Sequence, residues 1–240
     1  MPRHADPNAK DALVTAARAE FARKGLRGAR IEDITSACGL SKGSFYLHYE
    51  SKEALFGELV EAFTAAMRQV TSSRRDALTA FLDEHGPISR KDQSQRTGRY
   101  RELLELEAAH DLRALERLWA FRDVVGVLLR GAQGTSFEGY VWTLTDGEVE
   151  RVKGDFARFQ GNACRSDIPA EIVGSLMVGT YLLLAMQMSR MSEKPDLAAW
   201  SKSIHTLIRE GTAPLDEPLN KRTASASWTD GERRAEDERT

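Results

Sequence analysis

The side chains best suited to contacting phosphates and base edges gather between residues 41 and 52, a stretch of hydroxyls, an imidazole and two lysines. Ser41 is a favourable N-cap for a short helix that runs through about Tyr49. On a helical wheel of about 100° per residue, Phe45 and Tyr49 fall together and must face inward. They therefore fix which side of this helix is left for a ligand.

The outward side of the helix is formed by Gly43, Ser44 and Leu47, with Tyr46 and His48 on the two flanks. A glycine lets the backbone approach a partner closely, a serine reaches a base edge or a phosphate, and a leucine packs on a thymine methyl. The aromatic hydroxyl and the imidazole are placed to reach the phosphate walls of a groove. The pattern predicts a helix that lies in the major groove of DNA.

Two neighbouring elements must position this helix. Ile31, Ile34 and Cys38 recur at the spacing of one apolar helical stripe, and Gly39 follows as a residue that can take a positive φ and end that helix. Ser51 is an N-cap for a third helix. Two short helices joined by a tight turn with a glycine predict a helix-turn-helix unit.

The stretch resembles the N-terminal domain of the TetR family of bacterial transcriptional regulators, over about residues 10 to 56. The motif positions that match are Ile34, Gly39, Ser41, Gly43, Tyr46, His48, Lys52 and Leu55, and conservative replacements occupy Thr35, Cys38, Leu40, Ser44 and Tyr49. By this resemblance, the residues that contact bases are Lys42, Gly43, Ser44 and Leu47. Those that hold phosphates are Tyr46, His48 and Lys52, the last at a helix N-terminus that itself favours phosphate.

The sequence departs from the family pattern just before the first helix of the motif. The family usually has Thr or Ser where Ala29 and Arg30 stand, so the expected helix cap is missing. Either that helix end frays, or Arg30 contacts a phosphate directly. Glu32 is a second departure, and it weakens any base contact by this helix. A preceding helix from Asn8 to Lys24 is expected to cover the apolar faces of both motif helices.

Composition is that of a soluble globular protein, with 240 residues, 41% hydrophobic and 29% charged. Residues 1–56 hold nine basic and seven acidic side chains, although the whole chain has 34 and 36, so positive charge is enriched at the predicted DNA-binding end. Two cysteines and the lack of an apolar signal stretch predict a cytoplasmic location. The longest apolar stretch, Ile172–Met188, contains polar residues and predicts a buried helix with no membrane contact.

No strand-like alternation occurs, so the expected fold class is all-α. A long helix from Ser51 to Leu82 is predicted to break near residues 71–73, and the basic segment 88–101 is predicted to be a solvated loop, with a secondary nucleic-acid or protein contact as the alternative. Further helices are expected over about 103–129, 137–162, 169–191 and 195–211. The expected domains are a helix-turn-helix DNA-binding domain at 8–56, a ligand-binding and dimerisation domain at 57–211, and a disordered tail at 212–240.

The segment 169–191 is apolar almost all round, so one side can face its own domain while the other needs a partner. The resemblance implies a homodimer in which this segment and residues 195–210 pair with their mates. Two recognition helices then contact half-sites about one helical turn apart (~34–36 Å), so the predicted partner is a near-palindromic double-stranded DNA operator.

The resemblance also implies an apolar ligand cavity among the central helices. Its candidate lining residues are Trp119, Phe121, Phe137, Tyr140, Trp142, Phe156, Phe159, Met177 and Tyr181, with His110 and Arg122 as polar anchors. For any single one of these residues, ordinary core packing is the competing interpretation.

The predicted function is a dimeric repressor released from its operator by a small apolar ligand. An alternative keeps the DNA binding but places control in a protein partner or in abundance. An enzyme is disfavoured, because the five histidines are scattered without metal-ligand spacing and no glycine-rich phosphate loop occurs. No metal or cofactor is expected.

Overall fold

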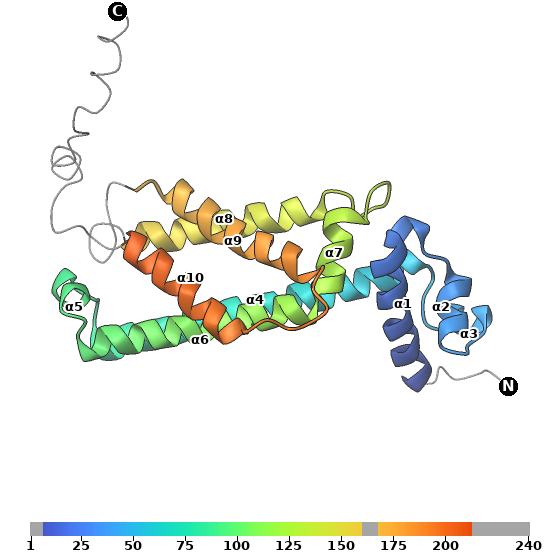
Figure 1. Ribbon diagram of the computed structural model, residues 1–240, viewed down its shortest axis with the longest axis horizontal. Coiled ribbons are helices and arrows are strands. Elements are labelled where there is room, and N and C mark those ends of the chain that lie inside the picture. Colours follow the sequence, from blue (N-terminus) through green and yellow to red (C-terminus); the bar gives the residue numbers. More distant parts are fainter. Residues whose placement is uncertain (1–6, 160–167, 213–240) are drawn as a thin grey trace, which may run out of the picture.

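A computed structural model describes residues 7–159 and 168–212, and every regular element within those ranges is a helix (Figure 1). The all-α prediction is therefore confirmed. The predicted polar arm (1–7) and the predicted tail (212–240) lie outside the described residues, except for Pro7 and Thr212. Asp167, which was expected to precede the apolar helix, also lies outside them.

Three helices pack at one end of an elongated molecule: α1 (Pro7–Gly28), α2 (Ile31–Ala37) and α3 (Lys42–Tyr46). Their shared core contains side chains that are fully or almost fully buried, namely Leu13, Phe21, Ile34, Phe45 and Phe56. Phe21 and Phe56 meet edge to face with ring centroids 5.5 Å apart. This core holds α3 against α1 and the start of the next helix.

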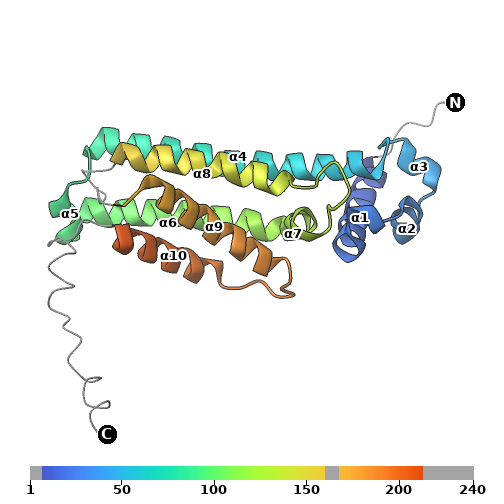
Figure 2. The same cartoon turned by 90° about the horizontal axis from the view of Figure 1, so that it is seen from above.

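The helix α4 (Lys52–His85) links this end to the rest of the molecule (Figure 2). It is continuous for 34 residues, so the predicted break near residues 71–73 is wrong. Relative to alanine, each threonine or serine destabilises a helix by only ~0.5 kcal/mol, so these residues do not break α4. The helix also packs along α6. Gly86 ends the helix, as predicted.

The basic segment 88–101 is ordered, so the loop prediction is wrong. Ser89 and Asp92 form a capping box that starts α5 (Arg90–Ser94). The guanidinium of Arg99 donates to the buried carboxylate of Asp92 and, at 2.7 Å, to the carbonyl of His85. Arg99 and Ser89 hold the pKa of Asp92 well below its usual range. The carboxylate of Asp92 therefore holds Arg99 together with the hydroxyls of Ser89 and Thr97.

The remaining helices are α6 (Gly98–Ala120), α7 (Arg122–Arg130), α8 (Tyr140–Phe159), α9 (Ala170–Met188) and α10 (Leu197–Thr212). α8 packs along α9, while α6 packs along both α4 and α10 (Figure 2). The chain turns at Phe121, which divides the predicted helix 103–129 into α6 and α7. The last helix begins at Leu197, later than the predicted start at residue 195. The carboxylate of Asp196 accepts a hydrogen bond from the backbone amide of Ala199, and this caps the start of the helix.

The apolar helix α9 is only partly covered within one chain. Ile172, Leu176 and Leu183 are more than half exposed, at 59%, 57% and 56%. Among the described helices, α9 alone has the length and apolar composition to cross a membrane, which for a single helix is weak evidence. Its exposed side is the one for which the sequence predicted a partner.

Candidate nucleic-acid interface and effector cavity

The predicted recognition helix is present but short. α3 covers five residues and ends at Tyr46, whereas the sequence suggested a helix through about Tyr49. After Tyr46 the chain turns, and the amides of His48 and Tyr49 both donate to the carbonyl of Phe45, at 2.9 and 3.0 Å. Ser41 caps the helix by accepting from the amide of Ser44 at 3.1 Å, as predicted.

The predicted orientation of α3 is confirmed. Phe45 and Tyr49 are buried, at 0% and 6% exposure, while Tyr46 and Leu47 are about half exposed at 52% and 50%. Phe45 contacts the rings of Tyr46 and Tyr49, with centroids 5.6 and 5.8 Å away. His48 is half-buried beside them. The outward residues are thus held on a rigid aromatic base.

The turn before α3 and the helix itself use glycine differently. Gly39 has a φ of 69°, which favours glycine, and it ends α2 as predicted. Gly43 has no such backbone need. A Cβ on Gly43 would make only an ordinary 3.6 Å contact with the Ser41 hydroxyl. The protein's own packing therefore does not require a glycine at position 43.

Glu32 on α2 faces the recognition helix. Its carboxylate accepts a hydrogen bond from the ammonium of Lys42 at 2.6 Å, and both side chains are more than half exposed. The hydrogen bond to Glu32 raises the pKa of Lys42, and the same bond lowers the pKa of Glu32. The departure from the family pattern at Glu32 therefore neutralises one of the predicted DNA-contacting cations.

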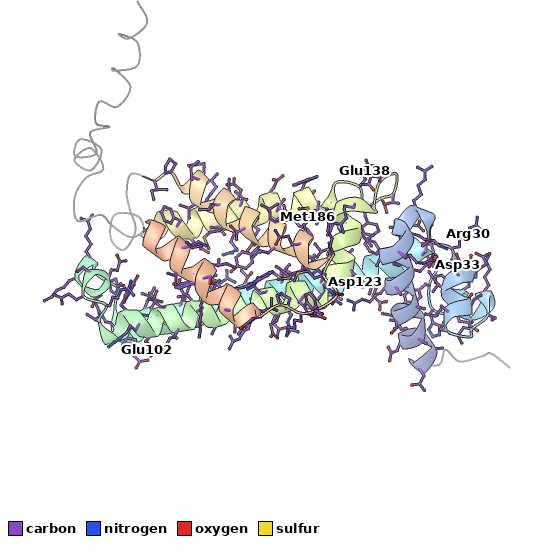
Figure 3. The ribbon with its side chains drawn as sticks, in the orientation of Figure 1. Arg30, Asp33, Glu102, Asp123, Glu138 and Met186 are labelled. Carbon is purple, nitrogen blue, oxygen red and sulfur yellow. The ribbon has the colours of Figure 1, made fainter. Side chains whose placement is uncertain are left out.

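Lys52 and Arg30 occupy the edge of this domain. The ammonium of Lys52 donates to the carbonyls of Arg27 and Ala29, at 2.8 Å each, so it satisfies backbone acceptors where α1 ends. Arg30 precedes α2 without a side-chain cap, as expected, and its side chain is exposed at the same end of the molecule as Asp33 (Figure 3). The phosphate contacts assigned to both basic residues stay predictions.

The end formed by α1, α2 and α3 is joined to the rest of the molecule through α1 and α7. Arg18 makes a bidentate ion pair with Asp123, with both N–O distances at 2.6 Å, and donates to the carbonyl of Ala120. Figure 3 shows Asp123 on α7 near α1. Nearby, the amide of Leu26 donates to the carbonyl of Gly131 at 2.8 Å. These contacts fix how α1 is oriented against the helical domain.

A cavity of about 210 Å³ lies within the larger domain, bounded by α4, α6, α8, α9 and α10. Of the predicted lining residues, Phe156 and Met177 are on its wall. None of its charged residues and not its histidine was among the predicted site residues; these are Arg74, Arg75, Glu107, Asp111, Arg151, Asp155 and His205. Glu107 and Asp111, together with His110, interrupt the buried and mostly apolar face of α6, and these two acids were the signal available in the sequence.

The other predicted aromatics are dispersed. Phe137 packs on Phe56, with centroids 5.0 Å apart, and on Tyr140, so both belong to the core next to the DNA-binding helices. Trp119 stacks on Arg122, and Phe121 packs against Phe63. The remaining predicted side chains are placed as follows: Trp142 is 58% exposed, His110 is buried beside Arg113, Tyr181 is near Asp111, and Phe159 has a side chain outside the described set. The structure therefore does not gather these residues around one cavity.

A short capped helix with an uncovered outer side, held on a buried aromatic base and preceded by a glycine turn, has the geometry of a helix-turn-helix unit. Residues 13–59 match the family described as bacterial regulatory proteins, tetR family. These residues are therefore similar to the N-terminal part of that family of regulators.

Among curated relatives, the chain is 43% identical over 58 residues to the HTH-type transcriptional repressor DhaR of Mycobacterium sp. (strain GP1), a match covering 24% of this chain and 29% of DhaR. The matched segments span half or less of the length of each curated relative compared.

Two solved structures share the fold over most of the chain. The ketosteroid transcriptional regulator KstR2 of Mycobacterium tuberculosis superposes with a TM-score of 0.61 at 18% identity, covering 86% of this chain and 95% of KstR2. The transcriptional regulator FadR of Bacillus subtilis, solved in complex with stearoyl-CoA, gives 0.54 at 14% identity, covering 84% and 98%.

Proposed function

We propose that this protein is a homodimeric repressor that binds a near-palindromic DNA operator and is released by a small molecule bound in the helical domain. The outer side of α3 is the observation that carries the DNA-binding part. Gly43, which the protein's own packing does not require, lies beside the exposed Tyr46 and Leu47. A bare backbone position next to exposed aromatic and aliphatic groups suits close approach to a duplex.

The homodimer is supported by the uncovered side of α9. Ile172, Leu176 and Leu183 are exposed there, and Leu207 of α10 is 74% exposed. Such apolar exposure is unusual on a soluble monomer and marks an interaction surface. A two-fold pair would bring two copies of α3 to successive half-sites about one helical turn apart (~34–36 Å).

The release mechanism is supported by the cavity between α4, α6 and α10, since α4 begins next to the recognition helix. A ligand that binds one arrangement of these helices better than another shifts the dimer toward that arrangement. The structure of FadR with stearoyl-CoA is an example of a ligand bound by a protein of the same fold.

Selection of bound DNA from a random pool, followed by fluorescence-anisotropy titration of the enriched site, tests this proposal. We expect a two-fold symmetric motif whose affinity falls by about 10³–10⁵ between 50 and 200 mM salt when six to ten phosphates are contacted. Failure to enrich any sequence would overturn it.

One observation favours a second candidate, a DNA-binding regulator of the same fold controlled by a protein partner or by abundance. The cavity of about 210 Å³ is smaller than the roughly 300–1,000 Å³ of most ligand sites. A thermal-shift screen separates the two candidates, because a ligand that binds the folded state raises the melting temperature.

A further inference from the structure

The turn between α1 and α2, formed by residues 25–30, is held by the start of α4. Lys52 is the first residue of α4, and its ammonium donates to the carbonyls of Arg27 and Ala29 at 2.8 Å each. Ala29 is itself only 2% exposed, so the turn is part of the packed interior at this point. The backbone of the turn and the side chain of Lys52 therefore form one unit.

The opposite side of the same turn is held by the end of α7, which packs along α1 (Figure 2). The amide of Leu26 donates to the carbonyl of Gly131 at 2.8 Å, and Leu26 is fully buried. A Cβ on Gly131 would lie only 3.0 Å from the Cα of Gly25, so the two backbones meet without room for a side chain. Any displacement of the turn must break this contact.

The position of Lys52 explains why its ammonium seeks the backbone. A positive charge in the first turn of a helix is disfavoured by the helix dipole, so it needs a partner of negative potential. The last carbonyls of a helix offer one, because they have no amide partner within that helix. Arg27 lies in the last turn of α1, and the carbonyls of Arg27 and Ala29 occupy two of the three N–H groups of the ammonium.

The turn in its own right determines where α2 and α3 lie. α2 begins directly after it, and Arg30 at the N-cap provides no side-chain cap, so residues outside α2 must fix its start. Ile34 of α2 and Phe45 of α3 are both fully buried in one core. A shift of the turn would therefore carry the recognition helix with it.

We propose that Lys52 is a positioning residue for operator binding, which holds the turn of residues 25–30 against α7 and so fixes the orientation of α3. This role replaces the phosphate contact that the family resemblance implied for Lys52. A phosphate that drew the ammonium away would leave the carbonyls of Arg27 and Ala29 without this donor, which is unfavourable for buried backbone groups. The inference rests on the proposed DNA binding.

Salt titrations of operator binding by fluorescence anisotropy distinguish the two roles. Lys52→Met keeps the length of the side chain but has neither a donor nor a charge. We expect at least tenfold weaker binding with an unchanged slope of log K against log salt, whereas loss of a phosphate contact would reduce that slope by about one. Lys91→Met, at an exposed position on α5, changes the net charge equally and should alter neither quantity. Circular dichroism at the same temperature verifies that both variants are folded.

Lys52→Gln gives a second, independent comparison, because it keeps a donor without the charge. It should bind the operator at least threefold more tightly than Lys52→Met, since a carbonyl needs only a donor, and its slope should equal that of the unaltered chain. Equal losses in the two variants, a slope reduced by about one in either, or full operator affinity in Lys52→Met would each overturn the positioning role. If Lys52→Met does not fold, the slope of Lys52→Gln decides.

Hydrogen exchange on the full chain tests the contact without DNA. Lys52→Met should speed exchange of the Leu26 amide at least tenfold, while the amide of Gly86, which donates to Leu82 at the far end of α4, should be unaffected. Unchanged exchange at Leu26 would show that Lys52 does not hold the turn. If the unaltered chain enriches no DNA sequence, the proposed function fails, and the exchange rates alone still decide whether Lys52 holds the turn.

Discussion

Gly43 separates the needs of the fold from the needs of DNA binding. Because a Cβ there meets only Ser41 Oγ at 3.6 Å, Gly43→Ala should leave the melting temperature unchanged or raise it, since alanine favours a helix over glycine by about 0.8–1.0 kcal/mol. Operator affinity should fall at least tenfold, because the added methyl keeps the backbone away from the groove. Differential scanning fluorimetry and anisotropy measure the two effects.

The matched control is Gly147→Ala on α8, where an added Cβ has no neighbour within 4 Å. It should change stability in the same direction without changing operator affinity. Undiminished operator binding by Gly43→Ala would show that α3 does not approach DNA at this position.

Glu32 sets the charge presented by Lys42. Glu32→Gln should release the Lys42 ammonium from its 2.6 Å ion pair and remove a negative charge from the same face. We expect operator affinity at 100 mM salt to rise several-fold and the slope of log K against log salt to steepen by about one. Asp83→Asn, an exposed acid at the far end of α4, changes net charge equally and should leave the slope unaltered. Salt titrations in which both variants behave alike would contradict this role for Glu32.

The helices differed in how well the sequence predicted them. The cap at Ser41, the turn at Gly39 and the inward faces of Phe45 and Tyr49 depend on neighbours within one or two turns, and all were predictable. The order in 88–101 depends on Arg99 reaching back to Asp92 across a turn, which charge composition does not reveal.

The cavity was harder to predict because its wall is assembled from helices distant in the sequence. Aromatic content pointed to residues such as Phe137 that instead fill the core beside α4, whereas the cavity is lined by acids and a histidine. Glu107 and Asp111 could have been noticed as acids on a buried stripe, but their partners Arg74 and His205 become evident only when α4 and α10 are placed.

The contact between α1 and α7 determines how firmly the DNA-binding helices are attached. Asp123→Asn removes the charge that Arg18 contacts through two 2.6 Å hydrogen bonds, so we expect a loss of about 1–3 kcal/mol in the free energy of unfolding. Glu116→Gln, which disrupts the exposed pair with Lys194, should cost less than about 1 kcal/mol. Urea denaturation of both variants measures the difference, and equal losses would show that the Arg18 pair has no special weight.

Among the described helices, α9 has an exposed apolar side that a single chain leaves uncovered. A stable dimer interface buries about 1,200–2,000 Å² in total, and a pair of α9 and α10 faces rich in leucine and isoleucine is suited to contribute to it. The same surface would hold the two copies of α3 at a fixed separation, so dimerisation and operator binding should be lost together.

Leu176→Asp places a charge in the middle of this surface, where burial against a second copy would leave it unpaired. We expect a monomer by size-exclusion chromatography with light scattering, and an operator affinity at least 100-fold weaker, because one α3 alone contacts only a half-site. Ala109→Asp, an exposed position on α6, should remain dimeric and bind normally. Since Leu176 is 57% exposed in the single chain, the variant should stay folded, which circular dichroism verifies. A Leu176→Asp protein that is still dimeric would place the interface elsewhere, and a monomer with full operator affinity would separate DNA recognition from two-fold symmetry.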